Sequence, residues 1–197
     1  AGQSAEDKQS DLQQAIEQHY ARLFAKAEQL RNELGVTVPI IGTGHLTSVG
    51  ARLTESVRAL YIGNLSAFPA NAFPPFDYLA LGHIHRPQKV AGLEHIRYSG
   101  SPIALSFDEA AQQQQVLCDE LNSHGLQRVT ELAIPCFRPL MSLTGSLAEL
   151  KQQFEQLAAQ LDESVVTWLE IQVQGDEYYA DLDERVSALC AQLPVEV

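Results

Sequence analysis

Several classes of protein are excluded by what this sequence lacks. No apolar run approaches the ~20 residues of a membrane-spanning helix, and the first residues show no charged-then-apolar signal peptide. The cysteines are few, odd in number and widely spaced, with no C-x-x-C pair: Cys118, Cys136 and Cys190. These absences argue against membrane insertion, a disulfide framework and a cysteine zinc site, so we expect a protein of the reducing cytoplasm.

Basic residues are also scarce. The chain has 13 Lys and Arg against 25 Asp and Glu, a formal net charge of −12, which taken alone argues against binding to nucleic acid. The charge is uneven, because residues 108–197 carry four basic and 16 acidic side chains, whereas residues 36–107 carry five basic and three acidic ones. That second, locally cationic stretch holds four of the six histidines: His45, His83, His85 and His95.

The pattern of apolar residues predicts an α/β protein. With 197 residues, 45% of them hydrophobic and 19% charged, the chain has the composition of a globular protein of one or two domains. Three- and four-residue spacing predicts an amphipathic helix over residues 11–34, begun by Ser10 with Gln13 and ended by Gly35. Short apolar runs predict three strands and a hairpin, at residues 36–41, 76–81, 95–98 and 116–134.

Pro135 marks a change of pattern. Beyond it the sequence predicts strand, helix, strand, helix and strand, at residues 140–143, 146–161, 165–173, 177–193 and 195–197. This β-α-β-α-β order predicts a small two-layer domain over residues 136–197, after a first domain over residues 1–135. Since the chain has no initiator methionine and stops inside the last predicted strand, we expect a fragment that is truncated at its C-terminal end.

Two predicted strands are each followed by a glycine and a histidine. Gly44-His45 comes after the strand at 36–41, and Gly82-His83-Ile84-His85 comes after the strand at 76–81. Ligands gather at the carboxyl ends of strands in open α/β sheets, and residues i and i+2 of an extended chain project together. Neutral imidazole is a common ligand of divalent first-row metals. We therefore predict a shared metal site of His45, His83 and His85, the alternative being surface or loop histidines.

Four neighbouring residues are candidates for binding substrate. Arg86 and Arg97 flank the histidines and could hold phosphate, while Ser99 and Ser101 belong to a tight loop whose N–H groups suit an anion. Ordinary surface arginines and a simple turn are the alternatives. A two-metal phosphoryl site also needs a bridging carboxylate and oxygen ligands, and the sequence contains neither D-x-H nor G-N-H. We therefore expect no catalytic residue within this chain.

Three motifs resemble those of the calcineurin-like metallophosphoesterases. G-H-x-H after a strand, with a lone G-H after an earlier one, marks this superfamily. Residues 73–88, FPPFDYLALGHIHRPQ, and residues 98–109, YSGSPIALSFDE, are similar to one branch of it, a family of bacterial DNA nuclease subunits. The resemblance implies that residues 1–135 are the C-terminal part of a metallophosphoesterase β-sandwich flanked by helices, and that a capping domain follows.

The resemblance also implies an activity. Enzymes of this branch are two-manganese phosphodiesterases that work with an ATPase subunit as double-strand exonucleases and single-strand endonucleases, cleaving DNA ends and hairpins in repair, recombination and replication. Carried over, His45 and His83 would bind one manganese ion and His85 the other, with the remaining ligands and the catalytic histidine upstream. We expect the fragment alone to be inactive, and self-association as a homodimer is a further expectation, since a missing half-sheet would expose apolar surface.

Two other functions remain open at this point. A metallophosphatase acting on nucleotides or phosphomonoesters would also carry G-H-x-H. A non-catalytic interaction module, whose histidines are structural, is the second alternative.

Overall fold

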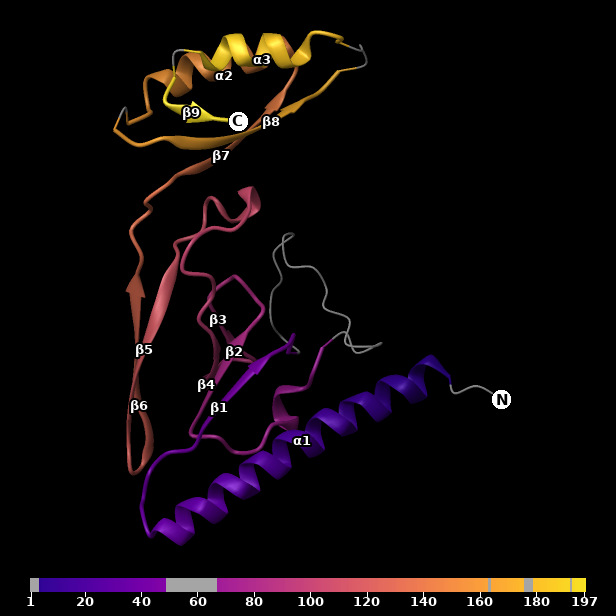
Figure 1. The fold of residues 1–197 in the computed structure, drawn as a ribbon, viewed down its shortest axis with the longest axis vertical. Coiled ribbons are helices and arrows are strands. Elements are labelled where there is room, and N and C mark those ends of the chain that lie inside the picture. Colours follow the sequence, from indigo (N-terminus) through magenta and orange to yellow (C-terminus); the bar gives the residue numbers. More distant parts are fainter. Residues whose placement is uncertain (1–3, 49–66, 163, 176–178, 192) are drawn as a thin grey trace. The chain divides into compact units, whose positions relative to one another are not determined.

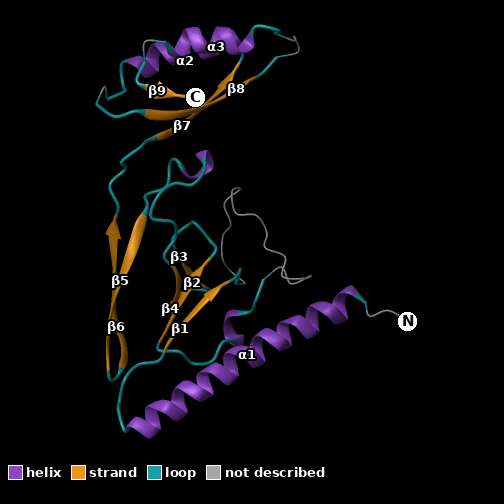
Figure 2. Cartoon of the chain, in the orientation of Figure 1, coloured by secondary structure: helices purple, strands orange, loops and turns teal. Residues whose placement is uncertain are grey.

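The computed structural model describes residues 4–48, 67–162, 164–175, 179–191 and 193–197 of the chain (Figure 1). It is a mixed α/β protein, with helices and strands along most of its length (Figure 2). The chain forms two compact units, one of Ala1–Ile103 with Gln113–Ile134 and one of Ala104–Gln112 with Pro135–Val197. Residues 104–112, placed in the first domain by the sequence prediction, therefore group with the C-terminal residues.

The first unit opens with the long helix α1, Ala5–Leu34. Ser4 caps it, because the Ser4 side chain accepts a hydrogen bond from the Asp7 N–H at 3.0 Å and the Asp7 carboxylate accepts one from the Ser4 N–H at 3.2 Å. The predicted start at residue 11 was wrong, since this earlier capping box leaves Ser10 inside the helix. The predicted end at Gly35 is confirmed.

A four-stranded sheet in the order β1-β2-β4-β3 carries the rest of this unit. Its strands are β1 Ile41–His45, β2 Tyr78–Gly82, β3 Gln88–Val90 and β4 Leu93–Tyr98, with β1, β2 and β4 parallel and β3 antiparallel to β4. The predicted strand at 36–41 was wrong, because the ladder begins only at Ile41, opposite Tyr78. Pro39, Pro74 and Pro75 lack the N–H groups that would extend the ladder backward.

An aromatic cluster fills the core beneath this sheet. Tyr20 of α1 meets Phe73 and Phe76 edge-on, with ring centroids 5.0 and 6.3 Å apart. Aliphatic residues of the strands complete the core: Leu79, Leu81, Val90 and Ile96. Because Tyr20 belongs to this cluster, α1 is fixed against the strands that carry the histidines.

The predicted hairpin is present as β5 Gln115–Asn122 and β6 Gly125–Ala133.

The second unit has the predicted β-α-β-α-β order. It consists of β7 Leu140–Gly145, α2 Leu147–Ala158, β8 Thr167–Val173, α3 Leu182–Cys190 and β9 Val195–Glu196, with parallel strands in the order β7-β8-β9. Leu143 and Leu169 of the sheet pack with Leu150, Phe154 and Leu157 of α2. Among the helices in the described ranges, none combines the length and apolar character needed to cross a bilayer.

The start of α2 provides a test of the second unit. Ser146 caps this helix by accepting a hydrogen bond from the Glu149 N–H, so Ser146→Ala should lower the free energy of unfolding by about 1 kcal/mol. Trp168 lies in β8 and is the only tryptophan of the chain, so its fluorescence during urea unfolding reports this unit. Ser187→Ala, at an exposed position inside α3, is the control and should not destabilise. Equal effects of the two variants would contradict the cap.

Candidate metal centre

Parallel pairing of β1 with β2 brings the two glycine–histidine pairs to one edge of the sheet. His45, the last residue of β1, lies opposite Gly82, the last residue of β2, and His83 follows directly. The imidazole rings of His45 and His83 have centroids 5.4 Å apart and are tilted by 54°. Two side chains separated by 38 positions in sequence therefore meet at the carboxyl ends of neighbouring strands.

Gly82 makes room for the His45 ring. A Cβ atom at residue 82 would lie 2.9 Å from His45 Nδ1, closer than side chains tolerate. The Tyr20 hydroxyl donates a hydrogen bond to the Thr43 carbonyl oxygen at 3.3 Å and so fixes the peptide that precedes Gly44. The ring of His45 is thus positioned by packing as well as by the strand that carries it.

His83 has an unusual backbone and an unsatisfied ring nitrogen. Its φ of +98° is a left-handed value for a residue with a side chain, the kind of strain, about 1–3 kcal/mol, that clusters at functional sites. Its Nε2 is buried and has no hydrogen-bond partner among the residues that the structure describes. Such orphaned atoms are rare in folded proteins and often indicate a missing ion or ligand. Both observations fit a residue that coordinates a metal.

The protonation state of His83 also suits coordination. Burial lowers its pKa below the ordinary value, and the neighbouring His45 and His85 lower it further by electrostatic repulsion. The imidazole is therefore neutral near pH 7, and only a neutral imidazole has a lone pair to give to a metal.

His85 is placed by the chain beyond the end of β2. The strand ends at Gly82, so the extended geometry assumed for His83 and His85 does not continue through them. Ile84 between them is buried, with 2% of its surface exposed. The carbonyl oxygen of His85 accepts a hydrogen bond from the Ser101 N–H at 3.0 Å.

The donor set at this edge is incomplete. Over the part of the chain that the structure describes, no group of three or more His, Cys, Asp or Glu side chains is arranged to hold a metal ion. The His45–His83 pair, with His85 close enough to repel charge on His83, fits two nitrogen ligands of a larger site. Manganese prefers additional oxygen ligands, which these residues do not provide.

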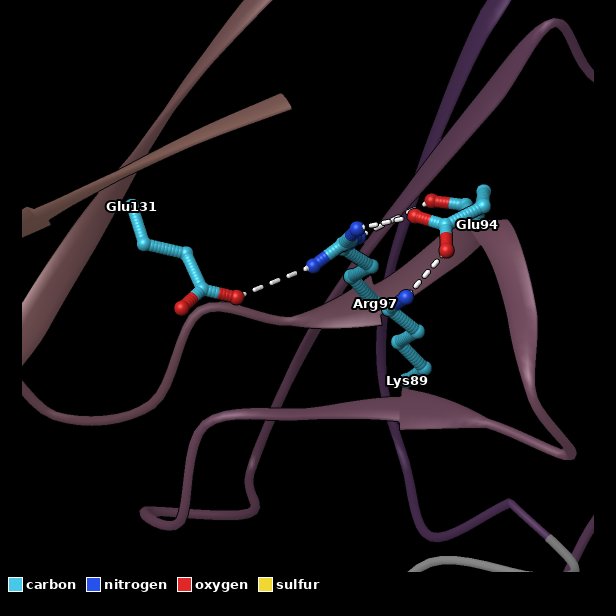
Figure 3. Close-up of polar contacts among 4 residues, drawn as sticks. All are labelled: Lys89, Glu94, Arg97 and Glu131. Atoms are coloured by element: carbon cyan, nitrogen blue, oxygen red, sulfur yellow. Dashed lines mark hydrogen bonds and ion pairs between the residues drawn. The ribbon is translucent and has the colours of Figure 1, made fainter. Parts of the chain in front are cut away.

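Arg97 is held by carboxylates rather than exposed to solvent (Figure 3). Arg97 is 6% exposed as a residue, and its guanidinium pairs with Glu94 of the same strand and with Glu131 of β6 at 3.3 Å. Lys89 of β3 also pairs with Glu94, and its hydrogen bond is the main reason why the pKa of Glu94 lies below its ordinary value. A phosphate could reach Arg97 only by displacing these carboxylates, so Arg97 acts as a link between β4 and the hairpin.

The other predicted substrate contacts differ in exposure. Arg86 is exposed and Ser99 is half-buried. Ser101 is buried, its hydroxyl donates to the Ile103 carbonyl oxygen, and its N–H binds His85. The hydroxyl and the N–H of Ser101, its two hydrogen-bond donors, are therefore engaged within the protein, which leaves Arg86 and Ser99 as the more accessible pair.

Sequence reasoning missed the two tyrosines whose hydroxyls bind the backbone around His45. Tyr20 interrupts the aliphatic stripe of α1, and Tyr98 ends β4. A tyrosine at a position that the pattern predicts to be buried could have indicated this role, because its hydroxyl needs a hydrogen-bond partner there.

Comparison with known proteins assigns the chain to a family. Residues 136–197 match the family model SbcD_C, described as "Type 5 capsule protein repressor C-terminal domain". Over 197 residues, 100% of this chain and 48% of the relative, the sequence is 45% identical to SbcD of the nuclease SbcCD from Escherichia coli strain K12. The chain belongs to the SbcD family.

Other SbcD proteins are more distant. The one from Staphylococcus epidermidis is 29% identical over 138 residues, and the one from Rhodobacter capsulatus is 34% identical over 126 residues. These matches cover 70% and 62% of this chain and 37% and 31% of the relatives. The chain thus spans about half the length of its Escherichia coli relative, and the aligned segments cover about a third of the other two.

Gly82 offers a test of how His45 is positioned. Gly82→Ala should displace the His45 ring, because the new Cβ would overlap Nδ1. The measurement is the ring ¹⁵N and ¹H chemical shifts of the histidines by NMR, with His45 and His83 shifting and His124 unchanged. Gly175→Ala is the control, because no atom of the described residues lies within 4 Å of the new Cβ there. Unchanged His45 signals in Gly82→Ala would contradict the packing described here.

Proposed function

We propose that this chain is part of the nuclease subunit of an ATP-dependent DNA nuclease. The observation that carries the proposal is the 45% identity to an SbcD nuclease subunit along all 197 residues. The histidine pair at the sheet edge supports it, because it supplies metal-binding chemistry. Since the chain spans 48% of that relative, the activity is proposed for the whole protein, and the chain alone is expected to be inactive.

The same proposal extends to the fold. We propose that the first unit is the C-terminal part of a calcineurin-like metallophosphoesterase domain and that residues 136–197 form its capping domain. Two features support this assignment: the parallel strands β1, β2 and β4 end at the histidine edge, and the C-terminal residues match the SbcD_C model.

The proposed centre divides the three histidines between two manganese ions. His45 and His83 would bind one ion and His85 the second, with carboxylate ligands supplied by residues outside this chain. Bound there, the two ions would activate water and stabilise the charge that develops on the phosphodiester. The protein's part is to keep His83 neutral by burial and to hold the His45 ring over Gly82. Exposed Arg86, with Ser99, is the proposed contact to the DNA backbone.

The proposed substrates are DNA ends and hairpins, in DNA repair, recombination and replication. The relatives are named as one part of an SbcCD complex, so we propose the SbcC ATPase as partner. The three free cysteines favour a location of the protein in the reducing cytoplasm, where the proposed DNA substrates would be found. Self-association of the protein as a homodimer remains part of the proposal.

Histidine variants of the full-length protein test this function. His83→Ala and His85→Ala should each lower manganese-dependent cleavage of linear duplex and hairpin DNA by at least about 100-fold, because a ligand is lost. Co-purification with SbcC should stay intact. His124→Ala, in the exposed turn between β5 and β6, is the matched control and should cleave normally.

The outcomes separate the alternatives. Hydrolysis confined to nucleotides or phosphomonoesters would replace the nuclease by a metallophosphatase. Absence of hydrolysis on every substrate, with manganese and partner present, would instead support an interaction module. Normal cleavage by His85→Ala would remove that residue from the metal centre.

A further inference from the structure

The hydroxyl of Tyr98 binds the chain that follows His45. Tyr98 is fully buried at the end of β4, and its hydroxyl donates a hydrogen bond to the Leu46 carbonyl oxygen at 2.7 Å. The phenolic oxygen of Tyr98 in turn accepts one from the Ser48 N–H at 2.9 Å. Both partners lie within three residues of His45, just beyond the last ladder position of β1. The Tyr98 hydroxyl therefore helps to hold the segment beyond the sheet, together with Phe68, whose N–H donates to the Thr47 carbonyl oxygen at 2.8 Å and whose carbonyl oxygen accepts from the Ser48 hydroxyl at 2.9 Å.

Three residues beyond Tyr98, the same segment binds the backbone of His85. The Ser101 N–H donates to the His85 carbonyl oxygen. Gly100 between them has φ +85°, and a Cβ there would lie 2.8 Å from that oxygen and 2.7 Å from the Pro87 ring. The close approach of residues 98–101 to the His85 loop thus requires glycine at this position.

We infer that residues 98–101 form a positioning clamp for the metal-binding histidines, with Tyr98 and Ser101 acting through the backbone rather than on the substrate. The inference deepens the proposed function and rests on it. His45 ends β1 and His85 follows three residues after the end of β2. Hydrogen bonds from the one segment 98–101 to the backbone at or beside each histidine fix their separation. Ligands of a metal site need such support, since outer contacts that orient them typically change metal affinity 10–100-fold.

Two further observations support the clamp. Tyr98 lies opposite Leu81 in the β2–β4 ladder, one residue before Gly82, so the clamp is in register with both histidine loops. Burial raises the pKa of Tyr98 to about 12, so the hydroxyl keeps its proton and can donate to Leu46 at any physiological pH.

Removal of the Tyr98 hydroxyl tests the inference. In the full-length protein, Tyr98→Phe keeps the ring but leaves the Leu46 and Ser48 backbone groups without this partner. Amide hydrogen exchange of residues 46–48, measured without metal, should accelerate about tenfold. The manganese concentration for half-maximal DNA cleavage should also rise about tenfold, with cleavage at saturating manganese largely retained.

Tyr78→Phe is the matched control. Tyr78 is buried on β2, and its hydroxyl bonds to Asp119 of β5, away from the histidine loops. Tyr78→Phe should lower the melting temperature much as Tyr98→Phe does, without changing the manganese requirement. An unchanged manganese requirement in Tyr98→Phe, or an equal rise in both variants, would overturn the inference.

Alanine variants of Gly100 and Gly92 test the contact between the clamp and the loop that carries His85. Both glycines have positive φ, +85° and +76°, but only Gly100 has neighbours that a Cβ would meet. Gly100→Ala should therefore shift the His85 ring signals in NMR and raise the manganese requirement, whereas Gly92→Ala suffers the same backbone penalty and should change neither. Equal behaviour of the two variants would contradict the clamp at His85.

The readouts distinguish two kinds of failure. Hydrogen exchange and histidine NMR are measured without metal, so they test the clamp even if the protein cuts no DNA. If His83→Ala cleaves normally, the proposed metal centre fails, whatever the tyrosine variants do. If His83→Ala is inactive and Tyr98→Phe has a wild-type manganese requirement, only the clamp fails.

Discussion

The register of β1 against β2 determines the rest of the candidate site. Because His45 is paired with Gly82, the ring of His45 lies over a residue without a side chain, and His83 begins where the ladder stops. A shift of one residue would turn His45 to the other face of the sheet and remove the pair. Asp77 fixes this register from the opposite end, since its carboxylate accepts the Ile40 N–H at 2.7 Å and its own N–H donates to the Ile40 carbonyl oxygen.

Buried tyrosines continue this control beyond the last ladder bonds. Tyr20 binds the Thr43 carbonyl oxygen from α1, and Tyr98 binds Leu46 and Ser48 from β4, so the backbone on both sides of His45 is anchored. Unpaired backbone groups at a buried strand end are costly, and a tyrosine satisfies them while its ring fills the core. The order of the histidine edge therefore depends on the aromatic core beneath it.

The sequence predicted the histidine edge because a strand ending in Gly-His is a local pattern. It misplaced the first strand because the run at 36–41 is mostly apolar. Pro39 within the run was an available warning, whereas Pro74 and Pro75, which also stop pairing, lie on the distant partner segment before β2. Arg97 was interpreted as a phosphate contact for a similar reason. Its partner Glu131 is 34 positions distant, on a hairpin whose docking no local pattern indicates. Long-range polar pairing was thus the information that the sequence patterns lacked.

Ion pairing also changes what the locally cationic stretch means. Of its five basic residues, Lys89 and Arg97 are paired with carboxylates, and Arg52 and Arg58 lie outside the described residues. Arg86 is the exposed cation beside the histidines within the described part of that stretch. A single exposed guanidinium is a weak attractor for a DNA backbone at physiological ionic strength. If the proposed centre is correct, its bound ions would be the largest positive charges at this edge, and attraction of the phosphodiester would depend on the metal ligands as much as on the surface arginine.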